Sequence, residues 1–299
     1  MSHGLFLPVE SHATPRAEDL RDLAALRLVL PRGSVFTHVT AASVADWWVP
    51  AFPEWVPVFA AVPVGHRGPR RPGLVVSRPT TAQVAWFVGG LPLAPPQEIL
   101  IRCARDLGVL DLVPIIDSAL RGGVQRASIA EICDTGRPGV RALRAALDLA
   151  DARAESAWES RLRVFHACHD VPAVPQVNLY DGDHFLGRAD LLVVGTHFVH
   201  EYDGAHHREP AQHTLDLRRE RRFAGSPYVR RGYTADDLLN HPGAVMAEID
   251  RALGRRSRPA RLARWHRLVE ASVYSQLGRN RLRNRWIRFM GVNEWSQAA

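Results

Sequence analysis

The sequence predicts an α/β protein of the α+β kind, in which a small α+β domain precedes an αβββαβ core. The main observation is a hairpin pattern over Arg188–His207, where the apolar runs Leu191–Val194 and Phe198–Val199 flank the dipeptide Gly195-Thr196. Glycine in the first position of a two-residue loop suits a tight antiparallel turn. The second observation is size: 299 residues with 46% hydrophobic content can bury a sizeable core and suit more than one domain.

Residues 1–150 are expected to form the first domain. A helix capped by Thr37 or Thr40 should end before Pro50, and the basic loop Pro63–Gly73 is either a solvated turn or a phosphate contact. Apolar spacing predicts the remaining elements. They are a helix over Ala17–Leu30, strands over Val58–Val62, Leu74–Arg78 and Trp86–Gly90, and helices over Glu98–Asp106, Leu110–Arg121, Ala127–Cys133 and Val140–Ala150.

A boundary at Asp151–Glu155 opens the second domain, residues 151–254, which is followed by a basic Arg/Trp-rich helical tail, residues 255–299. The first helix of this domain shows Trp158, Leu162, Phe165 and Cys168 at helical spacing. The later elements are strands over Pro175–Tyr180, Phe185–Val194 and Phe198–Asp203, a helix over Arg208–Ala224, a strand over Tyr228–Arg231 and a helix from Thr234 to Leu253.

Three acidic side chains should gather on the hairpin. If Gly195 and Thr196 form the loop, Asp190 lies opposite Glu201, and Asp203 points to the same face because side chains alternate along a strand. Clustered carboxylates repel each other unless a cation or a proton joins them. Oxygen ligands suit Mg²⁺ or Mn²⁺, so we expect a metal site at these three acids. Taken singly, each aspartate could instead cap a turn.

The basic charge is concentrated at the C-terminal end. All 38 Lys+Arg residues are arginine, the net charge is +7, and residues 255–299 hold eleven arginines against two glutamates. Arginine forks suit phosphate, although genome composition is an equal explanation for the arginine total. In the tail, arginines such as Arg264, Arg281 and Arg285 interleave with aromatic residues, which suits DNA binding. A membrane-surface helix would show the same pattern.

Several short motifs carry a resemblance to a known family. The tripeptide RAD, an eleven-residue step to EYDG, a following HH pair and the preceding stretch AESAWESRLRVFHACH resemble the Vsr-like endonucleases of the PD-(D/E)XK superfamily, over Glu155–Leu253. The resemblance implies a Mg²⁺-dependent DNA endonuclease with a restriction-endonuclease-like core. The implied catalytic residues are Glu159, Asp190, Glu201, Asp203, His206 and His207, with Asp190, Glu201 and Asp203 as metal ligands.

One departure from that superfamily is important. Its third strand normally carries E-x-K, but Asp203 stands two positions after Glu201, and the chain has no lysine. The implied proton-transfer group is therefore His207, because a histidine with a pKa near 6.5 can act as general base or acid. The missing lysine also favours a second hypothesis, a non-catalytic DNA-binding regulator with a degraded nuclease site.

The N-terminal half resembles AbiEi-type type IV antitoxins. The phrases THVTAAS, DLGVLDLVPIIDSALRGG and GVRALRAALDLADARAES carry this likeness, and an interaction or scaffold domain is the alternative. The resemblance implies a regulatory or targeting role for residues 1–150, and it is consistent with the regulator hypothesis above.

The remaining expectations concern contacts and compartment. In the helix after the hairpin, Arg218, Arg219 and Arg222 would meet DNA phosphates or form ion pairs along the helix. Three distant cysteines imply no disulfide framework, and the absence of a signal peptide or membrane span predicts a cytoplasmic protein. DNA is the expected partner, and a homodimer is left open. A zinc site remains as an alternative, with the candidate ligands His166, Cys168, His169, His197 and His200.

Overall fold

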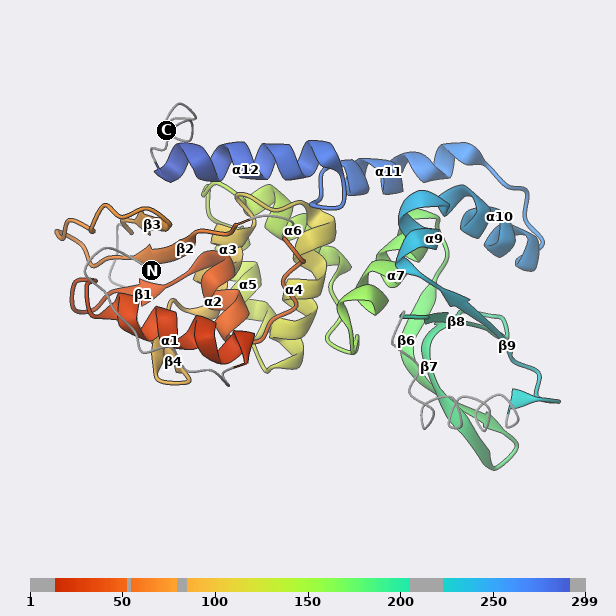
Figure 1. The fold of residues 1–299 in the computed structure, drawn as a ribbon. Helices are drawn as coiled ribbons and strands as arrows, with labels where there is room; N and C mark the ends of the chain where they lie inside the picture. Colours follow the sequence, from red (N-terminus) through yellow and green to blue (C-terminus); the bar gives the residue numbers. More distant parts are fainter. Residues whose placement is uncertain (1–13, 53–54, 80–84, 205–222, 291–299) are drawn as a thin grey trace.

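The computed structural model describes residues 14–52, 55–79, 85–204 and 223–290. These residues form a mixed α/β fold with one sheet in each half of the chain, and each sheet combines parallel with antiparallel pairs. The two sheets lie at opposite ends of the molecule in Figure 1, and the last two helices run along the side of both halves. Within the described ranges, none of the helices has the length and apolar character needed to cross a membrane.

The N-terminal half pairs a five-stranded sheet, in the order β3-β2-β1-β5-β4, with a group of helices. Each predicted helix and strand of this half is present, with small shifts at the ends. The sequence reasoning missed β1 and β5, which are too short to show a periodicity. The elements are α1 (Pro15–Arg27), β1 (Val35–Phe36), α2 (His38–Val44), β2 (Val58–Ala61), β3 (Leu74–Ser77), β4 (Trp86–Val88), β5 (Leu91–Leu93), α3 (Pro96–Cys103), α4 (Val109–Arg121), α5 (Arg126–Cys133) and α6 (Val140–Leu149).

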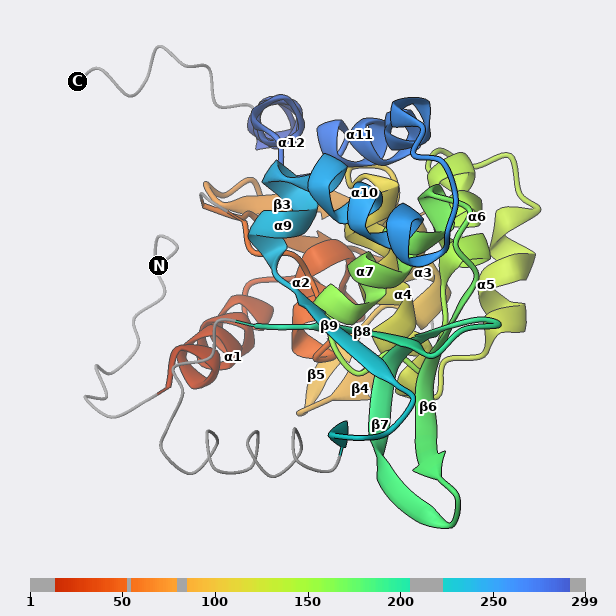
Figure 2. The same cartoon turned by 90° about the vertical axis from the view of Figure 1, so that its right-hand side faces the viewer.

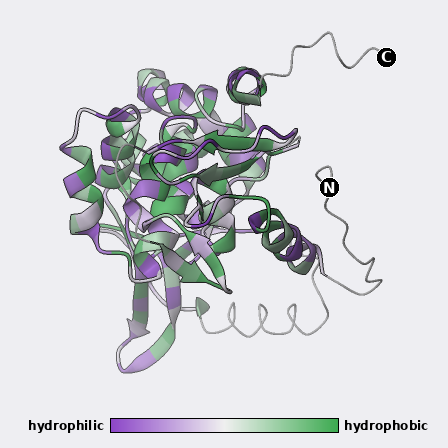
Figure 3. Ribbon diagram, turned by 90° about the vertical axis from the view of Figure 1, so that its left-hand side faces the viewer, coloured by the Kyte–Doolittle hydropathy of each residue, from purple (hydrophilic) through white to green (hydrophobic). Residues whose placement is uncertain are grey.

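Hydrophobic burial explains how these helices attach. Helix α1 carries both hydrophilic and hydrophobic stretches in Figure 3, and its Leu23 and Leu26 are buried. Helix α4 is different, because most of its side chains are buried, including Pro114 inside the helix. A helix that is apolar nearly all round belongs in a core. Helix α4 is therefore the central element of the N-terminal half.

The C-terminal half contains a four-stranded sheet in the order β6-β7-β8-β9. The predicted succession of one helix and three strands, then a later strand, is confirmed, whereas the predicted helix over 208–224 lies almost wholly outside the described residues. Figure 2 shows the β6–β7 hairpin extending away from the helices. The elements are α7 (Ala157–Cys168), β6 (Ala173–Asp181), β7 (His184–Val193), β8 (Phe198–Tyr202), β9 (Val229–Tyr233), α9 (Ala235–Asn240) and α10 (Pro242–Ala252).

The prediction of one continuous helix from Thr234 to Leu253 is wrong. Thr234 does cap a helix, since its hydroxyl accepts from the Asp237 N–H at 3.2 Å and the Asp237 carboxylate bonds back to it. Pro242 then starts a separate helix, α10. Proline lacks the N–H that would continue the first helix, but it suits the first turn of a new one.

The basic C-terminal region packs against both halves. A short 3-10 turn (Pro259–Arg261) leads into α11 (Leu262–Glu270) and α12 (Gln276–Met290). On α11, Trp265 is fully buried and its indole N–H donates to the Leu238 carbonyl at 2.8 Å. On α12, Trp286 is buried and its indole N–H donates to Asp106 Oδ2 at 2.9 Å. We call the segment from Leu262 to Met290, which contains α11, α12 and the residues that join them, the strap.

Two buried aspartates connect the strap to the N-terminal half. Asp106 bonds to His38 Nε2 at 3.1 Å and forms an ion pair with the Arg285 guanidinium of the strap, with 2.5 Å between Nε and Oδ1. Asp111 accepts from the Val273 N–H at 3.3 Å and from the Gly108 N–H at 3.1 Å. Gly108 must be glycine here, because a Cβ would lie 2.5 Å from a backbone oxygen of the strap.

An arginine links the same region to the second sheet. Arg161 of α7 is 1% exposed, and its guanidinium lies 4.8 Å from the ring centres of both Trp158 and Tyr274. Trp158 in turn stacks on Tyr202 of β8, with the ring centres 5.4 Å apart. Cation–π contacts are strongest where water is excluded, as it is here. Strand β8 is therefore positioned by a continuous aromatic and cationic stack that reaches the strap.

The charge on Asp111 should leave a pH signature. Burial raises the pKa of this carboxyl to about 6, against the opposing effects of Arg161 and two backbone N–H groups. A folded-state pKa above the unfolded value stabilises the fold at low pH, and this contribution is lost as pH rises through the folded pKa. Between about pH 4 and pH 7, wild type should therefore lose about 2 kcal/mol of unfolding free energy relative to Asp111→Asn.

Urea denaturation of both proteins across this pH range measures the difference between their free energies of unfolding. The pH-dependent contributions of the titratable groups that both proteins share cancel in this difference. Parallel stability curves for wild type and Asp111→Asn would contradict the raised pKa.

Candidate carboxylate site and basic surface

The β7–β8 register agrees with the prediction. Leu191 pairs with His200 and Leu192 with Val199, which is the register that sets Asp190 opposite Glu201. The predicted two-residue loop is wrong, because the connection spans residues 194–197. Its turn is closed by the bond from the Thr196 N–H to the Val193 carbonyl at 3.2 Å. The wider loop has the same centre as the predicted one, so the register does not change.

The Asp190 carboxylate reaches across to the next strand. Its Oδ2 accepts from the Tyr202 N–H of β8 at 3.0 Å. Tyr202 lies between Glu201 and Asp203 in the sequence. The bond therefore fixes Asp190 beside the backbone segment that carries the other two acids.

Glu201 is paired with an arginine of strand β9. A guanidinium nitrogen of Arg230 donates to Glu201 Oε2, and the side chains of Arg230 and Glu201 are 24% and 13% exposed. In the parallel β8–β9 pair, Arg230 aligns with Val199 and Gly232 aligns with Glu201. Side chains two apart in a strand share a face, so Arg230 and Glu201 point the same way. The Arg230 guanidinium also lies 4.9 Å from the ring centre of Phe223.

Asp203 lies just past the end of β8 and packs against a glycine. Its N–H donates to the Tyr233 carbonyl at 2.9 Å. A Cβ on Gly232 would approach the Asp203 Cβ to 3.3 Å, so this position has little room for a side chain. The backbone bond and the glycine together hold Asp203 against β9.

Glu159 uses its carboxylate to organise the start of α7. The Ser156 hydroxyl caps the helix by accepting from the Glu159 N–H at 3.2 Å. Glu159 Oε2 accepts from the Glu155 N–H at 2.9 Å and from the Gln176 side-chain amide of β6 at 2.8 Å. These bonds hold the segment before the helix and join the helix to the edge strand of the sheet. A structural role therefore accounts for the described contacts of Glu159.

The donor atoms suit a hard metal ion, and two of the carboxylate oxygens already accept hydrogen bonds. Carboxylate oxygens are the ligands that Mg²⁺ and Mn²⁺ take. One oxygen of Asp190 accepts from a backbone N–H, and one oxygen of Glu201 accepts from Arg230. Among the described residues, no three histidine, cysteine or acidic side chains are grouped to hold a metal ion. His206 and His207 lie outside the described residues.

Three histidines of the zinc alternative, His166, His169 and His200, are buried in the core, whereas His197 is exposed. His166 Nδ1 bonds to the Leu162 carbonyl and His166 Nε2 to His200 Nδ1, both at 2.7 Å. Burial lowers the pKa of His166 to about 4 and that of His200 to about 3. Nδ1 of His169 bonds to the Phe165 carbonyl at 2.6 Å, and burial raises the pKa of the Cys168 thiol to about 11. These groups are neutral, buried side chains near neutral pH.

The arginines predicted to contact DNA fall into three groups. Arg264 and Arg281 on the strap are exposed, although Arg281 also donates to the Ala271 carbonyl at 2.6 Å. Arg285 is held by Asp106, so a phosphate contact from it would have to replace a buried ion pair. Arg218, Arg219 and Arg222 lie outside the described residues.

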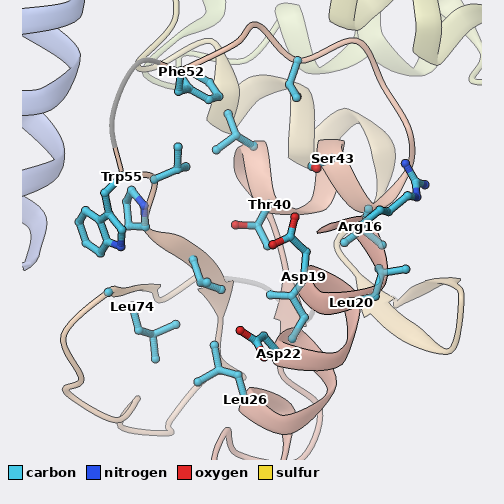
Figure 4. Close-up of a pocket in the computed structure, with 18 of the residues that line it drawn as sticks. Arg16, Asp19, Leu20, Asp22, Leu26, Thr40, Ser43, Phe52, Trp55 and Leu74 are labelled. Atoms are coloured by element: carbon cyan, nitrogen blue, oxygen red, sulfur yellow. The ribbon is translucent and has the colours of Figure 1, made fainter. Parts of the chain in front are cut away.

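A cavity of about 730 Å³ lies far from these acids, in the N-terminal half. It is bounded by α1, α2 and the segment around β2, and Figure 4 shows Asp19 and Asp22 on one side with Phe52 and Trp55 on the other. Its lining contains none of the site residues predicted from the sequence. Sequence reasoning did not predict this cavity, because residues from separate elements form its walls.

Two substitutions can separate the stability that comes from the Asp190 bond to Tyr202 from the effect of the Asp190 charge. An asparagine keeps an acceptor oxygen for the Tyr202 N–H, whereas an alanine leaves that half-buried donor unpaired. Asp190→Ala should therefore lower the free energy of unfolding by about 1–3 kcal/mol more than Asp190→Asn. Urea denaturation of the two variants gives the comparison. Equal losses would mean that the bond contributes nothing to stability.

Comparisons with known proteins give a restricted result. Two uncharacterized proteins of Mycobacterium tuberculosis, one from strain CDC 1551 / Oshkosh and one from strain ATCC 25618 / H37Rv, are each 29% identical to this chain over 191 residues. The alignments cover 61% of this chain and 69% of each relative. No protein-family model matches the sequence, and no solved structure matches it. The chain is therefore similar to proteins whose own function is uncharacterized.

Proposed function

We propose that the chain is a metal-dependent DNA endonuclease of the Vsr-like type, which hydrolyses phosphodiester bonds with a PD-(D/E)XK core in residues 151–254. The observation that carries the proposal is the β7–β8 register, which sets Asp190 opposite Glu201. The reach of Asp190 to the Tyr202 N–H supports it further, because the three acids are then confined to one short stretch of the sheet. A bound divalent ion would supply the positive charge that activates water and polarises the phosphate.

The exposed arginines of the strap support DNA as the substrate. Arg264, Arg267, Arg281 and Arg288 are exposed on α11 and α12, which run along both halves of the molecule in Figure 1. Exposed arginines can contact a phosphate backbone without reading its sequence. The cationic surface would then bind the duplex while the acids of the second sheet act on it.

Removing the charge of Asp190 should separate cleavage from binding. Asp190→Asn keeps the acceptor for the Tyr202 N–H but removes an anionic ligand. We expect metal-dependent cleavage of plasmid DNA to be lost, with DNA affinity unchanged or higher because repulsion toward phosphate falls. Asp183→Asn, which removes an exposed charge from the turn of the β6–β7 hairpin, is the matched control and should cleave as wild type does. Full cleavage by Asp190→Asn would reject the endonuclease proposal.

The role of the strap is best tested by point substitution. Deleting residues 255–299 would remove the buried Trp265 and Trp286 and leave Asp106 without two of its partners. Arg264→Gln/Arg281→Gln removes two exposed charges instead. It should weaken DNA binding and reduce the slope of log Kd against log salt by about two, since each phosphate contact contributes about 0.9.

The control for this experiment is Arg27→Gln/Arg141→Gln, which removes two exposed arginines from α1 and α6. Fluorescence anisotropy with a short duplex measures both variants at several salt concentrations. An equal change in slope for the two variants would show that the lower net charge weakens DNA binding, rather than the loss of arginines from the strap.

A non-catalytic DNA-binding regulator is the second candidate. The Glu201–Arg230 ion pair favours it, because this pair neutralises the acid without a metal ion, and the chain has no lysine to complete an E-x-K site. Wild-type protein that binds duplex DNA tightly, yet cleaves neither plasmid nor mismatched duplex with Mg²⁺ or Mn²⁺, would support the regulator over the enzyme.

A further inference from the structure

Arg230 is the cation that the structure brings to the acidic stretch. It lies on β9, on the same face as Glu201, and donates to the Glu201 carboxylate. Its side chain rests against the ring of Phe223, which keeps the guanidinium close to the sheet. An arginine remains charged at any pH that the folded protein meets. The acidic stretch therefore includes a permanent positive charge.

The geometry of this pair differs from that of an optimised structural ion pair. Paired arginine and carboxylate groups commonly form two parallel bonds. In the described structure Arg230 gives one nitrogen to Glu201, while its Nε is buried and has no hydrogen-bond partner. Leaving a buried donor unpaired costs stability. The contact with Phe223 leaves this donor unpaired, so we look for a further reason for the position of the arginine.

The carboxylate supplies an electrostatic reason. Glu201 is mostly buried and lies opposite Asp190 in the register, so like charges are close together. Such a group is stable only when a proton or a cation joins it. A metal ion and a guanidinium on the same carboxylate repel each other, so they cannot both approach it closely without a large electrostatic penalty.

We propose that Arg230 is a built-in counter-ion that competes with divalent metal ions for Glu201, so that the free protein holds its acidic site closed to metal. This inference rests on the proposed function, since it concerns the metal site of that function. It accounts for the absence of a gathered metal site among the described residues. It also gives Arg230 a role as the positive charge beside the acids, in a chain that has no lysine to place there.

The test measures Mn²⁺ binding directly, by the loss of the free-ion signal in electron paramagnetic resonance, without DNA. Arg230→Met removes the charge but keeps a long apolar side chain that can cover Phe223. It should bind Mn²⁺ about tenfold more tightly than wild type, or better. Arg230→Lys keeps the charge and should stay close to wild type. Arg231→Met is the matched control, because Arg231 neighbours Arg230 but pairs with Glu248.

A second substitution shows where the ion binds. Glu201→Gln in the Arg230→Met background should remove the gain in Mn²⁺ affinity. Circular dichroism of each variant checks the fold, and Arg230→Lys provides a folded comparison if Arg230→Met is unstable. In that case Arg230→Gln replaces Arg230→Met as the neutral variant.

The outcomes separate this inference from the proposed function. Equal or weaker Mn²⁺ binding by the neutral variants overturns the competition, even if wild type cleaves DNA. Tighter Mn²⁺ binding that depends on Glu201 supports the competition, even if neither protein cleaves DNA, in which case the endonuclease proposal alone fails. No Mn²⁺ binding by any variant overturns both.

Discussion

The attachment of the C-terminal strap to two buried aspartates is the constraint on which the arrangement of the two halves depends. Asp106 and Asp111 carry charges in the interior of the N-terminal half, and an unpaired buried charge is strongly unfavourable. Residues of the strap satisfy both of them. Because the same strap buries Trp265 against α7 and α9, the two sheets are held by one element.

In the second sheet, donors from neighbouring strands reach two acidic side chains that lie close together. Strand pairing sets Asp190 opposite Glu201, and each then takes a donor from the neighbouring strand, a backbone N–H for one and Arg230 for the other. The stack from Tyr202 through Trp158 and Arg161 fixes the strand from the opposite side. The acids therefore occupy a rigid part of the sheet, which suits a site that must hold its geometry.

Features that depend on neighbouring residues could be predicted from the sequence. Contacts between residues far apart in the chain could not. The register of the hairpin was predictable because the centre of a short loop determines it, even though Gly195 belongs to a wider turn than expected. The contacts of Glu159 could not be predicted, since its bond to Gln176 depends on how α7 meets the edge strand. Arg230 was missed because the parallel β8–β9 pairing brings it to Glu201 from 29 positions away, with no motif to mark it.

The strap also has a consequence for how the chain must fold as it is made. Trp286 and Asp106 are separated by 180 positions, and Val273 and Asp111 by 162. When the N-terminal half leaves the ribosome, the residues that satisfy its interior aspartates have not yet been synthesised. That half therefore cannot complete its core until the strap has also been synthesised and has left the ribosome. Contacts so distant in sequence slow folding, and the incomplete half would be a natural client for chaperones.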